Sequence, residues 1–229
     1  MSTDELHKMR HSLAHIMAQA VQHLWPQAKF GVGPAIDDGF YYDIDLGGAT
    51  ISEDDFPKIE KEMKKIIAAN YSFERRDVPI EDAIAWAENN HQVFKLELLN
   101  DLKRSGTTVA KELVGEDLGS VTDRDSKLKT VSLYSQGDYT DLCRGGHADS
   151  TGKVGAFKLM RVAGAYWRGD EKRQQMQRLY GVAFATHKEL DDYLKKLELA
   201  KQRDHRKLGK ELDLYTTSPL VGVGLPLFT

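Results

Sequence analysis

The sequence predicts an α+β protein in which an antiparallel sheet packs against helices and a long C-terminal linker helix follows. Apolar residues recur at helical spacing near the N-terminus, and short strand-like segments separated by glycine turns occupy residues 130–186. A basic stretch with helical periodicity then covers residues 187–211. Helices at both ends with consecutive short strands between them indicate a mixed fold with antiparallel pairing.

The composition indicates a globular chain. It has 229 residues, of which 41% are hydrophobic and 29% charged, enough for one large domain or two small ones. The chain holds one cysteine, no apolar run long enough to span a bilayer and no signal-peptide pattern in residues 1–10. These features are typical of a reducing, intracellular setting, so we expect a cytoplasmic location.

The sequence of the first half of the chain predicts helices, a turn and strands. Residues 3–25 form the clearest helix, which Ser2 or Thr3 can cap and Pro26 stops. Residues 31–45 read as a turn and a strand, with a hairpin tip at Gly47 and Gly48. A second helix is expected over 52–70 with Ser52 as its cap, then a strand over 71–78 and short helices over 81–89 and 91–102.

Residues 106–127 are polar and have no clear assignment. Four strand-like segments follow, at residues 130–134, 137–143, 155–163 and 180–186, and then one long basic helix at 187–211. The tail from residue 216 is rich in proline and glycine. We expect a domain over residues 1–186, a linker helix over 187–215 and a remnant of another domain over 216–229.

Charge is segregated along the chain, although the net charge is only -3. Residues 31–62 hold nine acids and two lysines, a balance of -7. Residues 153–178 and 195–210 each hold seven bases and two acids, a balance of +5. Clustered lysine and arginine attract phosphate backbones, but a solvated helix face explains the same pattern on charge alone.

Two pairs of potential ligands stand four residues apart, His11 with His15 and Cys143 with His147. At about 100° per residue, the two helical histidines share a face away from the apolar stripe, flanked by small alanines. With no second thiol in the chain, Cys143 forms no intrachain disulfide. If the pairs meet in one pocket, three imidazoles and a thiol either hold a metal or bind and hydrolyse a small activated substrate.

Longer motifs carry a resemblance to a known family. They are HSLAH at 11–15, LWP at 24–26, GFYYDID at 39–45, DLCRGGH at 141–147, AGAYWRGD at 163–170 and RDHRKLGKELDLY at 203–215. With these motifs, residues 11–215 closely resemble the editing domain of bacterial threonyl-tRNA synthetases. The paired H-x-x-x-H and C-x-x-x-H also resemble the editing domain of alanyl-tRNA synthetases, where the four residues bind zinc.

The resemblance implies hydrolysis of mischarged seryl-tRNA(Thr), with the acceptor end of tRNA(Thr) as partner. It implies a catalytic set of His11, His15, Lys95, Cys143 and His147, in which His11 positions or deprotonates water and Lys95 gives electrostatic support. Asp141, Tyr41, Tyr42 and Arg144 are implied substrate contacts. No cofactor is implied for editing, because the threonine-specific family edits without metal; zinc on His11, His15, Cys143 and His147 is the alternative.

The resemblance also shows departures. The family carries a ubiquitin-like domain before the editing domain and a class II catalytic core after it, so we expect a fragment that does not aminoacylate. ATP and zinc would belong to that missing core, and the full-length protein is expected to be a homodimer and the fragment a monomer. Gly146 stands where bacterial members usually have proline. A catalytically idle tRNA-binding module and a zinc-dependent hydrolase unrelated to tRNA remain the alternative functions.

Overall fold

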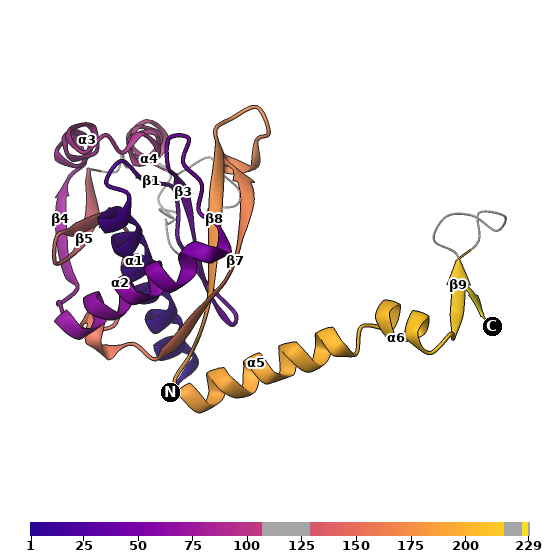
Figure 1. Ribbon diagram of the computed structural model, residues 1–229. Coiled ribbons are helices and arrows are strands. Elements are labelled where there is room, and N and C mark those ends of the chain that lie inside the picture. Colours follow the sequence, from indigo (N-terminus) through magenta and orange to yellow (C-terminus); the bar gives the residue numbers. More distant parts are fainter. Residues whose placement is uncertain (107–128, 218–225, 229) are drawn as a thin grey trace. The chain divides into compact units, whose positions relative to one another are not determined.

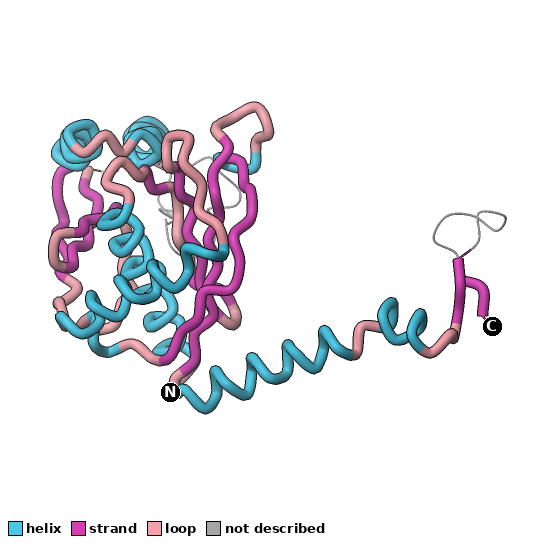
Figure 2. The backbone as a smooth tube through the Cα atoms, viewed as in Figure 1, coloured by secondary structure: helices cyan, strands magenta, loops and turns pink. Residues whose placement is uncertain are grey.

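The computed structural model describes residues 1–106, 129–217 and 226–228. The chain divides into two compact units, Met1–Ala185 and Thr186–Thr229. Figure 1 shows the elements of both units, and Figure 2 separates their helices, strands and loops. Within the described residues, no helix combines the length and the apolar character needed to cross a membrane.

Helix α1 (Thr3–Leu24) is the centre of the first unit. It begins with a capping box in which Ser2 Oγ accepts from the Glu5 backbone N–H and the Glu5 carboxylate accepts from the Ser2 backbone. Every residue from His11 to Val21 is buried, because α1 lies between two sheets and is also covered by α2 (Phe56–Ala69) (Figure 1). The helix therefore buries its polar face as well as its apolar stripe.

The larger sheet has the order β1-β3-β8-β7, with β2 also paired to β3, and all its pairs are antiparallel. Its strands are β1 (Lys29–Phe30), β2 (Ala35–Ile36), β3 (Gly39–Asp45), β7 (Ala156–Tyr166) and β8 (Gln175–Phe184). Phe40, Tyr42 and Ile44 alternate along β3 toward α1 and join its core. A register shift interrupts the β7–β8 pairing between Leu159 and Arg161.

A smaller antiparallel sheet has the order β4-β5-β6. It consists of β4 (Glu74–Pro79), β5 (Thr130–Gln136) and β6 (Tyr139–Leu142). Helices α3 (Ile80–Asn89) and α4 (Val93–Ser105) pack near it and share a second core with Leu133 and Leu142. Short 3-10 turns occur at Glu53–Asp55, Thr151–Lys153 and Trp167–Gly169.

The second unit contains α5 (His187–Gln202), α6 (His205–Glu211) and an antiparallel pair of β9 (Tyr215–Thr217) and β10 (Pro226–Phe228). Thr186 caps α5 through a capping box with Glu189. The predicted linker helix is present, with a break after Gln202 that separates α5 from α6. Its role as a linker, and the predicted domain assignments, remain predictions.

The α+β class and its antiparallel sheets are confirmed. The predicted hairpin at Gly47 and Gly48 is wrong, because β3 pairs with β1, β2 and β8 and the chain after β3 leads into α2. The four consecutive strand segments divide between two sheets, β5 and β6 in one and β7 and β8 in the other. Nearly all of the unassigned 106–127 segment lies outside the described residues.

Candidate functional site

The two ligand pairs meet between α1 and the turn that follows β6. His11 and His15 lie one helical turn apart on α1 and are 3% and 2% exposed. Cys143 comes directly after β6, and its Sγ lies 3.5 Å from His11 Nε2 and 3.3 Å from His147 Nε2. One ligand atom from each of the four residues lies within 4.8 Å of the others. We call these four residues the His/Cys cluster.

A buried ion pair lies beside the cluster. Lys95 Nζ on α4 is 2.6 Å from Asp141 Oδ1 on β6, and the two residues are 3% and 2% exposed. The Tyr42 hydroxyl on β3 donates to Asp141 Oδ2 and accepts from Lys95 Nζ at 3.1 Å. His15 Nε2 is 3.7 Å from the same carboxylate. Asp141 therefore compensates the ammonium and links β6 to α1, β3 and α4.

Ser12 fixes the turn to the helix. Its hydroxyl donates to the Lys8 carbonyl at 2.8 Å and accepts from the Ala148 backbone N–H at 2.9 Å. The same oxygen lies 3.5 Å from His147 Nδ1. A residue between the two helical histidines thus holds the segment that carries His147.

Aromatic rings surround His147. Its imidazole is stacked on Phe73, with ring centroids 4.8 Å apart and an interplanar angle of 4°. The Tyr134 ring lies 4.8 Å away on another side, and the His11 ring 4.3 Å away. The His147 side chain is only partly buried, so the cluster has one member within reach of solvent.

The turn depends on two glycines in left-handed backbone conformations. Gly145 has φ +113° and Gly146 has φ +81°. A Cβ on Gly145 would lie 2.2 Å from the Tyr134 hydroxyl, whereas one on Gly146 would meet no atom closer than 4.0 Å. The Gly145 N–H donates to Cys143 Sγ at 3.3 Å. Glycine is the residue that adopts these angles at little cost.

The buried environment sets the protonation of the site. Burial lowers the pKa of His147, and the neighbouring His15 and His11 lower it further. Burial likewise holds the pKa of His15 well below its ordinary value, with His11 and Lys95 adding to the effect. Burial, followed by the nearby Asp141 charge, raises the pKa of Tyr42. At neutral pH the site therefore contains neutral imidazoles at His15 and His147 and a protonated Tyr42.

The donor set is suitable for a metal. Zinc binds imidazole nitrogen at about 2.0–2.1 Å and thiolate sulfur at about 2.3 Å, which places the two ligand atoms about 3.5 Å apart in a tetrahedral site. The two sulfur–nitrogen distances of 3.5 and 3.3 Å match this separation. Direct hydrogen bonds between a thiol and imidazoles have the same spacing, so the geometry suits both a metal-bound and a metal-free cluster.

Of two other residues expected to contact substrate, only Arg144 lies near the cluster. Successive residues of a strand point to opposite faces, so Tyr41 lies on the other face of β3 from Tyr42. Its ring is 5.6 Å from the Tyr180 ring and 4.2 Å from the Arg178 guanidinium. Arg144 is exposed and lines a neighbouring cavity that Cys143 also lines.

Sequence patterns did not identify three residues of the site, Ser12, Phe73 and Tyr134. Tyr134 pairs directly with Asp141 across β5 and β6, so a correct strand register would have placed it on the site's face. Ser12 lies between the histidines and was identifiable as a polar residue within that motif. Phe73 reaches His147 through tertiary packing alone, and no sequence pattern indicates this contact.

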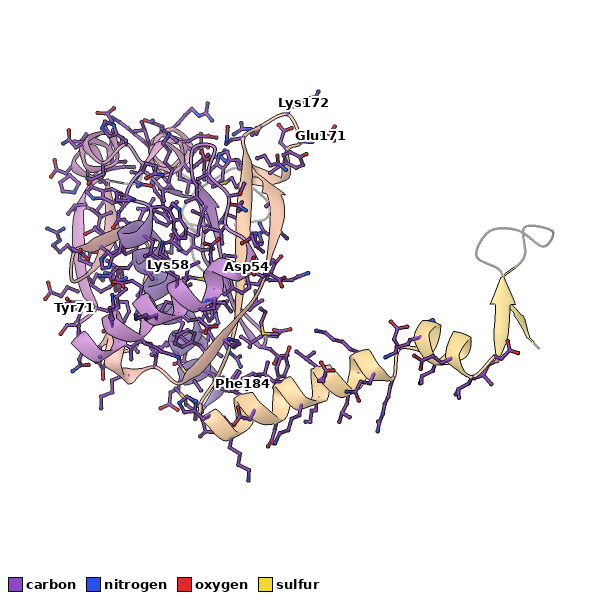
Figure 3. The ribbon with its side chains drawn as sticks, viewed as in Figure 1. Asp54, Lys58, Tyr71, Glu171, Lys172 and Phe184 are labelled. Atoms are coloured by element: carbon purple, nitrogen blue, oxygen red, sulfur yellow. The ribbon has the colours of Figure 1, made fainter. Side chains whose placement is uncertain are left out.

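The basic stretch at 153–178 is largely engaged with carboxylates from other parts of the first unit. Lys172, which Figure 3 labels on the loop between β7 and β8, is exposed. Four of the other bases form ion pairs: Lys158 with Glu60, Arg168 with Asp101, Arg173 with Glu97 and Arg178 with Asp43. The +5 balance of this stretch therefore overstates the cationic surface available to a phosphate backbone.

Known proteins resemble this chain over nearly its whole length. A family model described as the threonyl and alanyl tRNA synthetase second additional domain matches residues 131–180. A threonine–tRNA ligase from Anoxybacillus flavithermus is 49% identical over 220 residues, which cover 96% of this chain and 30% of that protein. Threonine–tRNA ligase 1 from Bacillus subtilis is 47% identical over 227 residues, which cover 99% of this chain and 32% of that protein.

The family model gives the class of protein: residues 131–180 match the second additional domain of threonyl and alanyl tRNA synthetases, an editing-associated region of aminoacyl-tRNA synthetases. More particularly, the chain is homologous to a segment of bacterial threonine–tRNA ligases that includes this domain. The chain spans about a third of the length of these relatives.

Proposed function

We propose that this chain hydrolyses the ester that joins serine to tRNA(Thr), releasing serine and free tRNA. The observation that carries the proposal is the convergence of the His/Cys cluster and the Lys95–Asp141 pair, from α1, α4, β6 and the turn after β6, in one buried region. Such a region offers neutral imidazoles, a thiol and a compensated ammonium beside one partly exposed residue, His147. Homology to threonine–tRNA ligases supports tRNA(Thr) as the partner.

A second, hydrolytic site is needed because binding alone discriminates poorly between threonine and serine. A synthetase that selects threonine over serine distinguishes one methyl group, which is worth about 1 to 3 kcal/mol, or roughly 10 to 200-fold. A hydrolytic pocket that admits the seryl ester and has too little room for the threonyl methyl removes the serine that passes the first selection. The proposed pocket discriminates by size rather than by an added polar contact.

Each residue has a role in this hydrolysis. His11 positions the attacking water and accepts its proton as the water oxygen forms a bond to the ester carbon. The ester bond to the ribose oxygen then breaks, and that oxygen takes the proton. The Lys95 ammonium, held against Asp141, provides positive potential for the developing oxyanion.

The remaining cluster residues bind rather than react. Cys143 and His147 hold the hydroxyl and amine of the seryl group, and His15 maintains the packing between His11 and Asp141. Because the pKa of His147 and of His15 is lowered, both imidazoles stay neutral at pH 7, and His147 accepts a hydrogen bond from the substrate. No covalent intermediate on the thiol is needed.

Zinc is the alternative occupant of the cluster. His11, His15, Cys143 and His147 would hold it, and a bound zinc would supply a Lewis acid for the ester carbonyl. Metal analysis of the purified protein and of Cys143→Ser separates the two cases. Stoichiometric metal that is lost in the variant contradicts the metal-free site, and absence of metal from an active wild-type protein supports it.

A His11→Ala variant tests the proposed hydrolysis. We expect seryl-tRNA(Thr) hydrolysis to fall by about 100-fold or more, as for loss of a positioned acid–base group, with tRNA affinity unchanged. His7→Ala is the matched control, because His7 lies one turn earlier on α1 outside the cluster. Binding of tRNA without hydrolysis by the wild-type chain would instead identify a catalytically idle binding module.

A further inference from the structure

A row of polar side chains extends along α1 from the His/Cys cluster. His11, His15, Gln19 and His23 follow one another at intervals of four residues, so they lie on one face of the helix. The first three are buried, and His23 is exposed. The turn between β5 and β6 covers the middle of this row, since Gln19 Nε2 donates to Asp138 Oδ1 at 2.7 Å.

Gln136, the last residue of β5, adds a buried amide to this face. Its side chain is 1% exposed. In the described part of the chain, neither His15 Nδ1 nor the Gln136 amide has a hydrogen-bond partner elsewhere. Burial has the largest effect on the pKa of His15 and lowers it, whereas an interaction with the Gln136 side chain acts in the opposite direction. The amide and the imidazole therefore lie side by side, and buried polar atoms of this kind are nearly always paired.

The other nitrogen of His15 determines which tautomer the site favours. His15 Nε2 lies 3.7 Å from Asp141 Oδ2, and a neutral imidazole carries a proton on only one of its nitrogens. A proton on Nε2 presents a donor to the carboxylate, whereas a proton on Nδ1 presents a lone pair that its negative charge repels. The favoured Nε2–H tautomer leaves Nδ1 as an acceptor, which requires a buried donor.

Two buried groups from the β5–β6 hairpin are candidates for this donor, Gln136 and Tyr139. The Tyr139 ring is 6.1 Å from the His15 ring. After burial, the Asp141 charge has the largest effect on the pKa of Tyr139 and raises it, which places the Tyr139 hydroxyl toward that carboxylate. The Gln136 amide is then the donor that remains for His15 Nδ1.

We propose that Gln136 is a positioning residue, which donates from its side-chain amide to His15 Nδ1 and so fixes the Nε2–H tautomer. His15 then presents its N–H to Asp141, the carboxylate that holds the Lys95 ammonium at 2.6 Å. Gln136 acts through His15 and Asp141 and does not itself contact the substrate. The inference rests on the proposed function, since it names a residue that maintains that hydrolytic site.

The tautomer of His15 can be measured directly by nuclear magnetic resonance. The two ring nitrogens of a neutral imidazole differ in ¹⁵N shift according to which one carries the proton, and His15→Gln assigns the signals. We expect the Nε2–H tautomer in the wild-type chain. Gln136→Met keeps the length of the side chain and removes the donor, so the Nδ1–H tautomer should appear. In the same variant kcat for seryl-tRNA(Thr) should fall about tenfold with little change in KM.

Gln177→Met is the matched control. Gln177 exchanges two hydrogen bonds with the backbone of Ile51, at 2.8 and 3.0 Å, and lies on β8. Its loss should lower stability in urea unfolding and leave both the His15 tautomer and kcat unchanged. This comparison separates a general loss of packing from a specific effect on His15.

Two results would overturn the inference. One is an Nδ1–H tautomer in the wild-type chain, which needs no variant to be folded. The other is a Gln136→Met protein whose His15 signals and kcat match those of Gln177→Met. If the tautomer changes as expected but the wild-type chain does not hydrolyse seryl-tRNA(Thr), the role of Gln136 toward His15 stands and the proposed hydrolysis fails.

Discussion

The Asp141 carboxylate contacts three other buried side chains of the site. Its carboxylate binds the Lys95 ammonium and the Tyr42 hydroxyl and lies 3.7 Å from His15. All of these groups are buried, so each depends on the others for its polar partners. An ion pair in such surroundings adds little net stability, but removing one partner leaves an uncompensated charge.

The Asp141→Asn variant should therefore unfold much more easily than the wild type. We expect a loss of about 3 to 5 kcal/mol in the free energy of unfolding, because the Lys95 ammonium stays buried without its counter-charge. Urea unfolding of Asp141→Asn, Lys95→Met and the double variant forms a double-mutant cycle. The double variant should lose less than the sum of the single losses, and strict additivity would contradict the buried pair.

The Gly146→Pro variant tests the turn that presents His147. Proline fixes φ near -65°, whereas Gly146 has φ +81°, so the turn must rebuild even though the resemblance implies proline here in other members. We expect seryl-tRNA(Thr) hydrolysis to fall at least tenfold. The control Gly146→Ala has open space around its Cβ, and should cost about 1 to 2 kcal/mol of stability while keeping activity. Full activity in the proline variant would show that the turn does not position His147.

At the scale of elements, α4 is held in place by the segment that joins β7 and β8. Trp167 Nε1 donates to the Glu97 carboxylate at 2.9 Å, and Arg168 lies 2.6 Å from Asp101. Arg168 itself has φ +57°, an uncommon conformation for a residue other than glycine. Because Glu97 and Asp101 are on α4, which also carries Lys95, these contacts connect the segment to the helix that presents Lys95.

Substitution of Arg168 should act on hydrolysis through Lys95. We expect Arg168→Gln to lower kcat for seryl-tRNA(Thr) about tenfold with little change in KM, since a shift of α4 by a fraction of an ångström displaces Lys95 from the reacting ester. Arg168→Lys should restore part of kcat. The neighbouring Lys172→Gln is the control, because Lys172 is exposed on the same loop. A tenfold rise in KM with no change in kcat would contradict this positioning role.

His23 joins α1, α2 and the β5–β6 turn. Its Nδ1 lies 3.0 Å from Glu62, and its Nε2 lies 3.0 Å from Asp138. Burial opposes the imidazolium charge, but hydrogen bonds to Asp138 and Glu62 outweigh it, so the pKa of His23 is raised. The stabilisation is therefore fully present below about pH 6.5, the unfolded value, and is lost as the pH rises through the folded pKa.

The His23→Gln variant measures this contribution. Asp138 is 69% exposed in its side chain, and water screens the interaction, so we expect a loss of only about 1 kcal/mol at pH 5.5. The difference between wild type and variant should be smaller at pH 8.5, because the imidazolium loses its proton as the pH rises through the raised pKa of His23. Urea unfolding at the two pH values checks this, and a difference that grows with pH would contradict the sign.

The sequence could predict the helices better than the sheets. The spacing of apolar residues identifies α1 and α2, and Ser2 marks the start of α1, because these signals are local. Ser52, which was predicted to cap the second helix, instead caps the 3-10 turn Glu53–Asp55, and α2 begins after Asp55. The partition of β5, β6, β7 and β8 into two sheets depends on long-range pairing that no local pattern records. The motifs that hold the cluster residues are local, so the sequence could identify them. The contact of Phe73 with His147 depends on tertiary packing and could not be predicted, and neither could the orientation of Tyr41 away from the cluster.

At the scale of the whole molecule, every residue of the His/Cys cluster and the Lys95–Asp141 pair lies in the first unit, Met1–Ala185. The chain covers about 30% of the threonine–tRNA ligases it resembles, so aminoacylation, dimerisation and binding of the rest of tRNA(Thr) by a longer protein remain proposals. The proposed hydrolytic site nevertheless consists of residues of the first unit and contacts only the acylated end of the tRNA.

The most direct measurement compares the hydrolysis of seryl-tRNA(Thr) and threonyl-tRNA(Thr) by this chain under single-turnover conditions. A pocket that rejects one methyl group by size should hydrolyse the seryl ester at least about tenfold faster, and the rate should depend on His11. Equal rates for both esters, or a seryl rate no greater than that in buffer, would contradict the proposal that these residues form a serine-selective hydrolytic site.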